Sequence, residues 1–173
     1  MSSQPIAALL KGGDRRSIGR SNAVVKLVLR APKRFAELMQ CLWSNDPIVR
    51  MRAADAAEKI SALQPELLKP YKAETLGLLA ETLQIELRWH LAQMIRRLPL
   101  TQAERSRAAE ALQLYLEDRS SIVRTFALQA LTDLSQSDAA LRPRVREILE
   151  QSTVTGTAAM KARARRLLKE LKL

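Results

Sequence analysis

Cysteine, glycine and aromatic residues are all scarce in this chain of 173 residues. The single cysteine, Cys41, cannot form an intramolecular disulfide, which fits a reducing compartment, and its place in an apolar run predicts a buried, unreactive thiol. Only five glycines occur, and valine and isoleucine never alternate with polar residues as they do in strands. Alanine, leucine, arginine, glutamate and glutamine, which all favour helices, dominate instead. The sequence therefore predicts an all-α protein.

Long apolar stretches are also missing. None approaches the roughly 18 residues that a membrane-spanning helix needs, and the apolar run at residues 6–10 is too short for the core of a signal peptide. We therefore expect a cytoplasmic protein with no membrane as a partner.

The residues that enzymes and metal sites require are equally sparse. His90 is the only histidine, and no second cysteine is present, so no familiar set of metal ligands can be assembled. The sequence contains no His-Glu-x-x-His pattern, no Cys-x-x-Cys pair and no phosphate-binding loop. We therefore expect no enzyme activity, no cofactor and no metal, and we interpret His90 as a structural or surface residue.

The net charge of +11 is concentrated near the two ends. Residues 11–34 hold eight basic residues against one acid, residues 160–173 hold six against one, and the remainder is close to neutral. The basic clusters comprise Arg15, Arg16, Arg30, Lys33 and Arg34 near one end, and Arg163, Arg165, Arg166 and Lys169 near the other. Such clusters favour nucleic acid or another polyanion at long range, but they also suit the solvated outer face of a terminal repeat.

A short motif recurs along the chain. The segment from Asp118 through Leu131 has a near copy from Asp14 through Leu27, with Asp, Arg, Ser, Ile, Arg, Ala and Leu at the same offsets. A shorter copy runs from Asn45 through Ala53. Its Asp46 is followed by proline and therefore also signals the start of a helix.

Alignment on the base early in every second helix extends the repetition to five copies. The spacings are 30, 38, 36 and 37 residues, a period typical of stacked helix pairs that bury their apolar faces on one another. The aligned bases are Arg20, Arg50, Arg88, Arg124 and Lys161. We predict a single domain over residues 1–173, with repeats at about 4–30, 33–61, 66–98, 101–135 and 138–171.

Local signals place several helix ends. Thr101 with Glu104 forms a capping-box pattern at the start of a helix. We expect a helix at residues 144–150, a break at residues 153–157 and a last helix at about 158–171.

On these motifs the chain resembles the HEAT-repeat family, including the short HEAT-like repeats of bacterial proteins. The resemblance implies a right-handed α-solenoid of about five helical hairpins, whose second helices line an inner surface. It also implies a structural ladder of aspartates and arginines along the stack, with Asp14/Arg20 and Asp118/Arg124 as pairs and Asp46 as a less regular member. Because such solenoids commonly act as scaffolds, we expect an unidentified protein partner to dock on the inner surface.

Other interpretations stay open. The aligned bases and Trp89 could bind a partner or phosphate groups rather than form a ladder, and the basic ends could bind nucleic acid. The HEAT-like DNA glycosylases for alkylated bases and the HEAT-like bilin lyases are remote enzymatic alternatives. Tetratricopeptide repeats have a similar period, but their Trp-x-x-Leu-Gly-x-x-Tyr pattern is absent.

Overall fold

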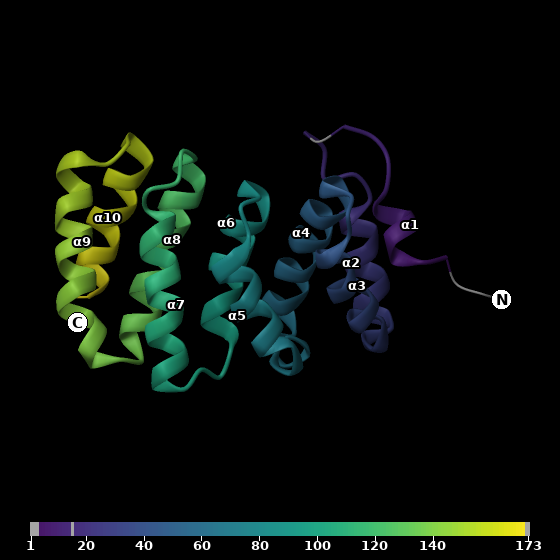
Figure 1. Ribbon diagram of the computed structural model, residues 1–173, viewed down its shortest axis with the longest axis horizontal. Helices are drawn as coiled ribbons and strands as arrows, with labels where there is room; N and C mark the ends of the chain where they lie inside the picture. The colour runs from purple at the N-terminus through teal and green to yellow at the C-terminus, as the bar shows by residue number, and fades with distance from the viewer. Residues whose placement is uncertain (1–3, 15, 172–173) are drawn as a thin grey trace. The chain divides into compact units, whose positions relative to one another are not determined.

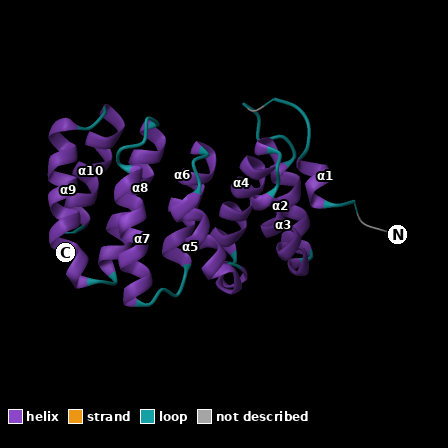
Figure 2. Ribbon diagram, viewed as in Figure 1, coloured by secondary structure: helices purple, strands orange, loops and turns teal. Residues whose placement is uncertain are grey.

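The computed structural model describes residues 4–14 and 16–171. Figure 1 shows that this part of the chain is built from α-helices, and Figure 2 shows that it contains no strand. The expected all-helical class is therefore confirmed. The chain divides into two compact units, Met1–Glu74 and Thr75–Leu173, and each is described by itself.

In the first unit, the long helix α4 is the element on which the others pack. Helices α1, α2 and α3 all contact it, and its buried face is built largely from alanines, which allow neighbouring helices to approach closely. Asp46 begins α4 as expected, since its Oδ1 accepts a hydrogen bond from the backbone N–H of Ile48 at 2.8 Å. The helices of this unit are α1 Ile6–Leu10, α2 Ser21–Arg30, α3 Phe35–Gln40 and α4 Pro47–Leu63, joined by the 3₁₀ turns Pro32–Arg34, Cys41–Trp43, Pro65–Leu67 and Lys69–Tyr71.

A buried arginine on α4 holds the loop between α1 and α2. The Arg52 side chain donates to the carbonyl oxygens of Leu10 (2.8 Å), Asp14 (3.1 Å) and Ser17 (3.1 Å). Arg52 is only 2% exposed, so the loop supplies the acceptors that its charge would otherwise lack. The backbone on both sides of residue 15 is therefore anchored to α4 by Arg52, although the side chains described there are exposed.

Cys41 behaves as the sequence suggests. The residue is 5% exposed, and its thiol donates to the backbone oxygen of Glu37 at 3.3 Å. Burial, and then the nearby Glu37 carboxylate, raise the pKa of the Cys41 thiol to about 11. The thiol is therefore protonated at neutral pH, and the reactive thiolate is not populated.

In the second unit, α8 is the central helix. It contacts α6, α7, α9 and α10, and Figure 1 shows these helices side by side. Leucines that are 1% exposed or less fill the space between them, including Leu91, Leu112, Leu131 and Leu167. The elements are α5 Lys72–Glu81, which spans the point where the units are divided, α6 Ile85–Met94, α7 Gln102–Tyr115, α8 Ser121–Gln136, α9 Arg142–Thr155 and α10 Ala158–Glu170, with 3₁₀ turns at Ile95–Arg97 and Ala139–Leu141.

Two expected helix ends in this unit have different outcomes. The capping box is confirmed, because Thr101 Oγ1 accepts from the Glu104 N–H and the Glu104 carboxylate accepts from the Thr101 N–H. The break expected at residues 153–157 is wrong over its first part, since α9 continues to Thr155. The hydroxyl of Thr155 donates to the backbone oxygen of Gln151 in the preceding turn, so this threonine remains helical.

Candidate functional site

The aligned arginines Arg50 and Arg88 perform the same structural task in their respective units. Arg50 Nη1 donates to the Ser44 carbonyl oxygen at 2.6 Å, and Arg88 Nε donates to the Thr82 carbonyl oxygen at 2.8 Å. Each arginine thus reaches back six residues, into the turn that precedes its helix. The recurrence of this contact is the structural counterpart of the sequence alignment.

Asp118 pairs with the arginine of the preceding helix pair. Its Oδ2 lies 2.5 Å from Arg88 Nη1, and its Oδ1 accepts from the Ser120 N–H at 2.7 Å. Burial alone would raise the pKa of Asp118, but the Ser120 N–H and then Arg88 outweigh it and lower this pKa below its ordinary value. The carboxylate is therefore held in its charged form.

This pairing corrects the expected Asp118/Arg124 pair. The start of α8 presents Asp118 to α6, from which Arg88 extends, so the ion pair links two successive helix pairs. Arg124 itself has a buried Nε with no hydrogen-bond partner in the described structure. Lys161, the last of the aligned bases, is half-buried on α10.

The three aspartates of the repeat motif share a turn contact. Asp14 Oδ1 accepts from the Arg16 N–H at 3.0 Å, which matches the contacts of Asp46 and Asp118 with the residue two positions on. Arg20 is exposed at the start of α2, and no ion pair joins it to Asp14 within the described residues. The aspartates therefore serve first to shape the turns before second helices.

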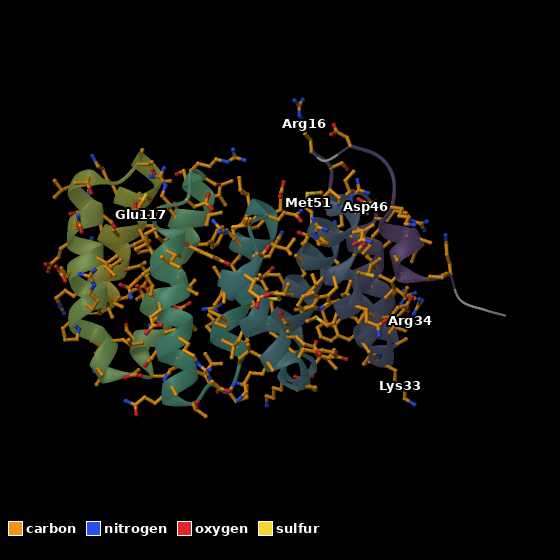
Figure 3. The ribbon with its side chains drawn as sticks, viewed as in Figure 1. Arg16, Lys33, Arg34, Asp46, Met51 and Glu117 are labelled. Atoms are coloured by element: carbon orange, nitrogen blue, oxygen red, sulfur yellow. The ribbon has the colours of Figure 1, made fainter. Side chains whose placement is uncertain are left out.

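The basic residues near the beginning of the chain are mostly solvated. Arg16 and Lys33 point away from the ribbon (Figure 3), and Arg30 is also exposed. Arg34 differs, because its guanidinium donates to the Gln4 carbonyl oxygen and pairs with the Glu37 carboxylate at 2.6 Å. Arg15, which the sequence analysis placed in this cluster, lies outside the described residues.

The basic residues near the end of the chain separate onto different sides of α10. Arg165 and Lys169 are exposed, and the structure describes no ion-pair partner for them. Arg163 and Arg166 instead line a hollow formed by α6 with its 3₁₀ extension, α8 and α10, the second helices of this unit.

This hollow has a volume of about 420 Å³ and a strongly polar wall. Four arginines face two carboxylates across it, so its formal charge is close to +2. We call it the arginine hollow. Its lining residues are Ala92, Gln93, Arg96, Arg97, Phe126, Gln129, Asp133, Gln136, Arg163, Arg166 and Glu170.

A neutral amide stands at the centre of the arginine hollow. Gln129 Oε1 accepts hydrogen bonds from Arg163 Nη1 and Arg166 Nη2, both at 2.9 Å. The amide nitrogen of Gln129 donates to Asp133 Oδ1 at 2.9 Å, and Asp133 Oδ2 lies 3.6 Å from Arg96 Nη1. Two cations thus converge on one oxygen that carries no formal charge.

Burial and neighbouring charges change the pKa of two groups in the hollow. Burial raises the pKa of Asp133, and the Gln129 hydrogen bond and the Arg96 charge offset this only in part. Burial, followed by the like charge of Arg166, lowers the pKa of Arg163 although Glu170 and Asp133 act in the opposite direction. Arg163 is therefore partly desolvated beside Arg166, whose own side chain is 58% exposed and lies 3.3 Å from Glu170 Oε1.

One aromatic side chain, Phe126, lines the hollow, and other aromatic rings stack behind it. The Trp89 ring stacks on Phe126, with centroids 5.8 Å apart and planes 22° apart, and also lies against His90 at 3.6 Å. The Arg163 guanidinium lies 5.7 Å from the Phe126 centroid. Trp89, expected on the inner surface, is thus engaged with its neighbours, and the stack limits the positions open to Arg163.

Sequence reasoning singled out only Arg163 and Arg166 among the residues of the hollow, and missed Arg96, Gln129 and Asp133. A signal was present in the alignment, because Gln129 and Arg166 both lie five positions after their aligned base, and Asp133 and Glu170 both lie nine after it. Positions five and nine share a helix face, so equivalent residues of successive helices were placed to meet.

No model of a known protein family matches this chain, and none of the curated proteins compared with it matches either. Within the described residues, no helix is long and apolar enough to cross a bilayer. No group of three histidine, cysteine, aspartate or glutamate side chains in that part of the chain is arranged to hold a metal ion. The chemistry that the arginine hollow offers is the binding of an anionic group.

Proposed function

We propose that this protein is a HEAT-like α-solenoid and acts as a non-enzymatic scaffold in the cytoplasm. The proposal places a protein partner on the second-helix surface, at the arginine hollow. The all-helical structure, the matching contacts of Arg50 and Arg88, and the Arg88–Asp118 link between successive helix pairs support the repeat architecture.

The arginine hollow is the single observation that carries the binding role. Arginine is enriched at the energetic centres of protein interfaces, because its planar fork combines directed hydrogen bonds with a broad apolar surface. Arg163 is held by both Gln129 and Phe126, so little of its side-chain freedom remains to be lost when a partner binds. An acidic segment of a partner protein fits this charge.

Site-directed photocrosslinking in cells tests this proposal. A crosslinking amino acid at Gln136, an exposed residue of the hollow, is expected to capture a protein partner, whereas the same amino acid at Glu147 on α9 is not. Arg96→Glu should abolish the capture from Gln136, because it reverses a charge that faces the partner. Absence of any protein adduct from Gln136, or equal capture from both positions, would contradict the proposed docking surface.

Nucleic-acid binding is a second candidate, favoured by Arg165 and Lys169, which are exposed and have no ion-pair partner among the described residues. Contacts with phosphates release counterions, so the logarithm of the affinity for duplex DNA should fall linearly with the logarithm of the salt concentration. The double variant Arg165→Glu/Lys169→Glu should then bind more weakly and show a shallower salt dependence. An affinity that is indifferent to these changes would remove this candidate.

A further inference from the structure

The convergence of Arg163 and Arg166 on Gln129 suggests what kind of group the hollow receives. We propose that the arginine hollow binds a phosphate monoester, carried by a phosphorylated side chain of the partner protein. In the bound state Arg163 and Arg166 donate to phosphoryl oxygens instead of to Gln129 Oε1. This inference rests on the proposed scaffold function, because that function supplies the partner.

The position of the Gln129 oxygen shows that the site is ready to hold an acceptor. Nη1 of Arg163 and Nη2 of Arg166 each lie 2.9 Å from the same amide oxygen. Guanidinium groups bind phosphate through parallel hydrogen bonds that are stronger than those to a neutral amide. A phosphoryl group at this position would exchange two charge–neutral hydrogen bonds for charge–charge ones, and Gln129 keeps its other partner, Asp133.

The charge of the hollow favours a monoester over a diester. Four arginines against Asp133 and Glu170 leave a formal charge of +2. A phosphate monoester carries about −1.5 to −2 at neutral pH, whereas each phosphodiester of a nucleic-acid backbone and each carboxylate carries a single negative charge. A dianion therefore matches the formal charge of the lining residues.

Size and accessibility are consistent with a side chain that enters from solvent. The volume of about 420 Å³ lies in the lower part of the range for small-ligand sites and exceeds what the phosphoryl group alone requires. Arg96 and Arg166 have side chains that are 53% and 58% exposed, so both can move toward an incoming group. Arg163, stacked against Phe126, is the fixed element.

The test uses small probes with the whole chain. Binding of methyl phosphate, dimethyl phosphate and acetate at neutral pH is followed by titration calorimetry and by the NMR signals of arginine side-chain N–H groups. Gln129→Glu is the most direct variant, because it introduces a carboxylate between Arg163 and Arg166 and so acts as an internal competitor. Arg163→Gln and Arg166→Gln each remove a donor, and Arg165→Gln is the matched control on an exposed side of the same helix.

We expect saturable binding of methyl phosphate, with dimethyl phosphate and acetate at least about tenfold weaker, which is the scale of one charge-assisted hydrogen bond. Gln129→Glu, Arg163→Gln and Arg166→Gln should each weaken methyl phosphate binding by about tenfold or more, and Arg165→Gln should not. Circular dichroism checks that the variants are folded. Equal binding of the three probes, equal loss in Arg165→Gln, or full binding by folded Gln129→Glu would each overturn the proposal.

A second set of measurements separates this inference from the scaffold function. Peptides from the crosslinked partner are compared in phosphorylated, unphosphorylated and glutamate-substituted forms, and only the phosphorylated form should bind with the affinity of the intact partner. Capture from Gln136 without methyl phosphate binding would refute the phosphate site and leave the scaffold standing. Methyl phosphate binding without any protein capture would assign the hollow to a free phosphorylated molecule, and would refute the phosphorylated partner.

Discussion

The Arg88–Asp118 ion pair gives a quantitative test of how successive helix pairs are joined. The Asp118 side chain is 4% exposed and that of Arg88 is 20% exposed. Breaking a fully buried pair by removing one partner costs about 3–5 kcal/mol, and exposed pairs contribute about 0–1 kcal/mol. Arg88 also donates a hydrogen bond to Thr82 and lies 4.9 Å from the Tyr115 ring centroid, and neither contact involves Asp118. We therefore expect Asp118→Asn to cost about 2 kcal/mol.

A double-mutant cycle isolates the pairwise contribution. Asp118→Asn retains an oxygen that can accept from the Ser120 N–H, so the change removes the charge more than the turn contact. Arg88→Met should cost a similar amount, and the double variant should lose about 1 kcal/mol less than the sum of the single variants. The measurement is urea unfolding of the Trp43→Phe protein, in which Trp89, adjacent to Arg88, is the remaining tryptophan. The pair does not join these helices if the losses of the two single variants are strictly additive. The same conclusion follows if Asp118→Asn costs less than about 0.5 kcal/mol, as an exposed surface substitution does.

The same pair predicts a dependence on pH with a definite sign. Because the pKa of Asp118 is lower in the folded protein than its ordinary value of about 3.9, its stabilising contribution is complete above that value. The contribution is lost as the pH falls through the folded-state pKa. The stability difference between wild type and Asp118→Asn should therefore shrink in acid, and a difference that stays constant from neutral pH into strong acid would contradict the assignment of charge.

Three further predictions concern other buried contacts. Gly19→Ala should destabilise the first unit more than Gly12→Ala, because both residues have positive φ but only the Gly19 Cβ would meet the Arg52 guanidinium, at 2.6 Å from its Cζ; equal losses in thermal unfolding would contradict this. Tyr115→Phe should cost about 1 kcal/mol, since the hydroxyl donates to the Leu79 carbonyl oxygen at 2.7 Å. Burial raises the pKa of Tyr115, so wild type should lose this stability as the pH rises above about 10, and Tyr115→Phe should not. If the stabilities of the two proteins fall in parallel with pH, the buried hydroxyl does not contribute as expected. Leu131→Ala should cost about 2–5 kcal/mol and Leu131→Asp should unfold the second unit, and an unchanged melting temperature would show that Leu131 is not in the core.

The helices could be predicted from the sequence because their signals are local. Asp46 followed by proline and the pair Thr101/Glu104 each satisfy backbone N–H groups within a single turn, and both begin helices as expected. The end of α9 could not be predicted, because a threonine has two possible local roles. Thr155 can either cap a new segment or donate to the preceding helical turn, and its residue type does not distinguish these roles.

The partner of Asp118 required information that a local motif does not contain. Arg124 is six residues away in the sequence, whereas the observed partner Arg88 is thirty residues away and reaches Asp118 only because α6 packs on α8. The spacing between repeats gives a period but not the direction in which an arginine extends. Burial of Arg52 was likewise not predictable, because its acceptors are backbone oxygens of a loop.

The arginine hollow shows where functional information lies in a repeated sequence. In the second unit, the residue three positions after each aligned base is fully buried. It is always apolar or small, because neighbouring helices pack against it: Leu91, Ala127 and Ala164. Five and nine positions after the base, the side chains lie outside the core and line the hollow, and their charge differs from one helix to the next. Packing therefore fixes the recurring positions and leaves the others free to carry a binding surface. The most regular positions of the repeat thus mark the turns and the core, whereas the site lies at positions whose charge varies, with Gln129 between two arginines.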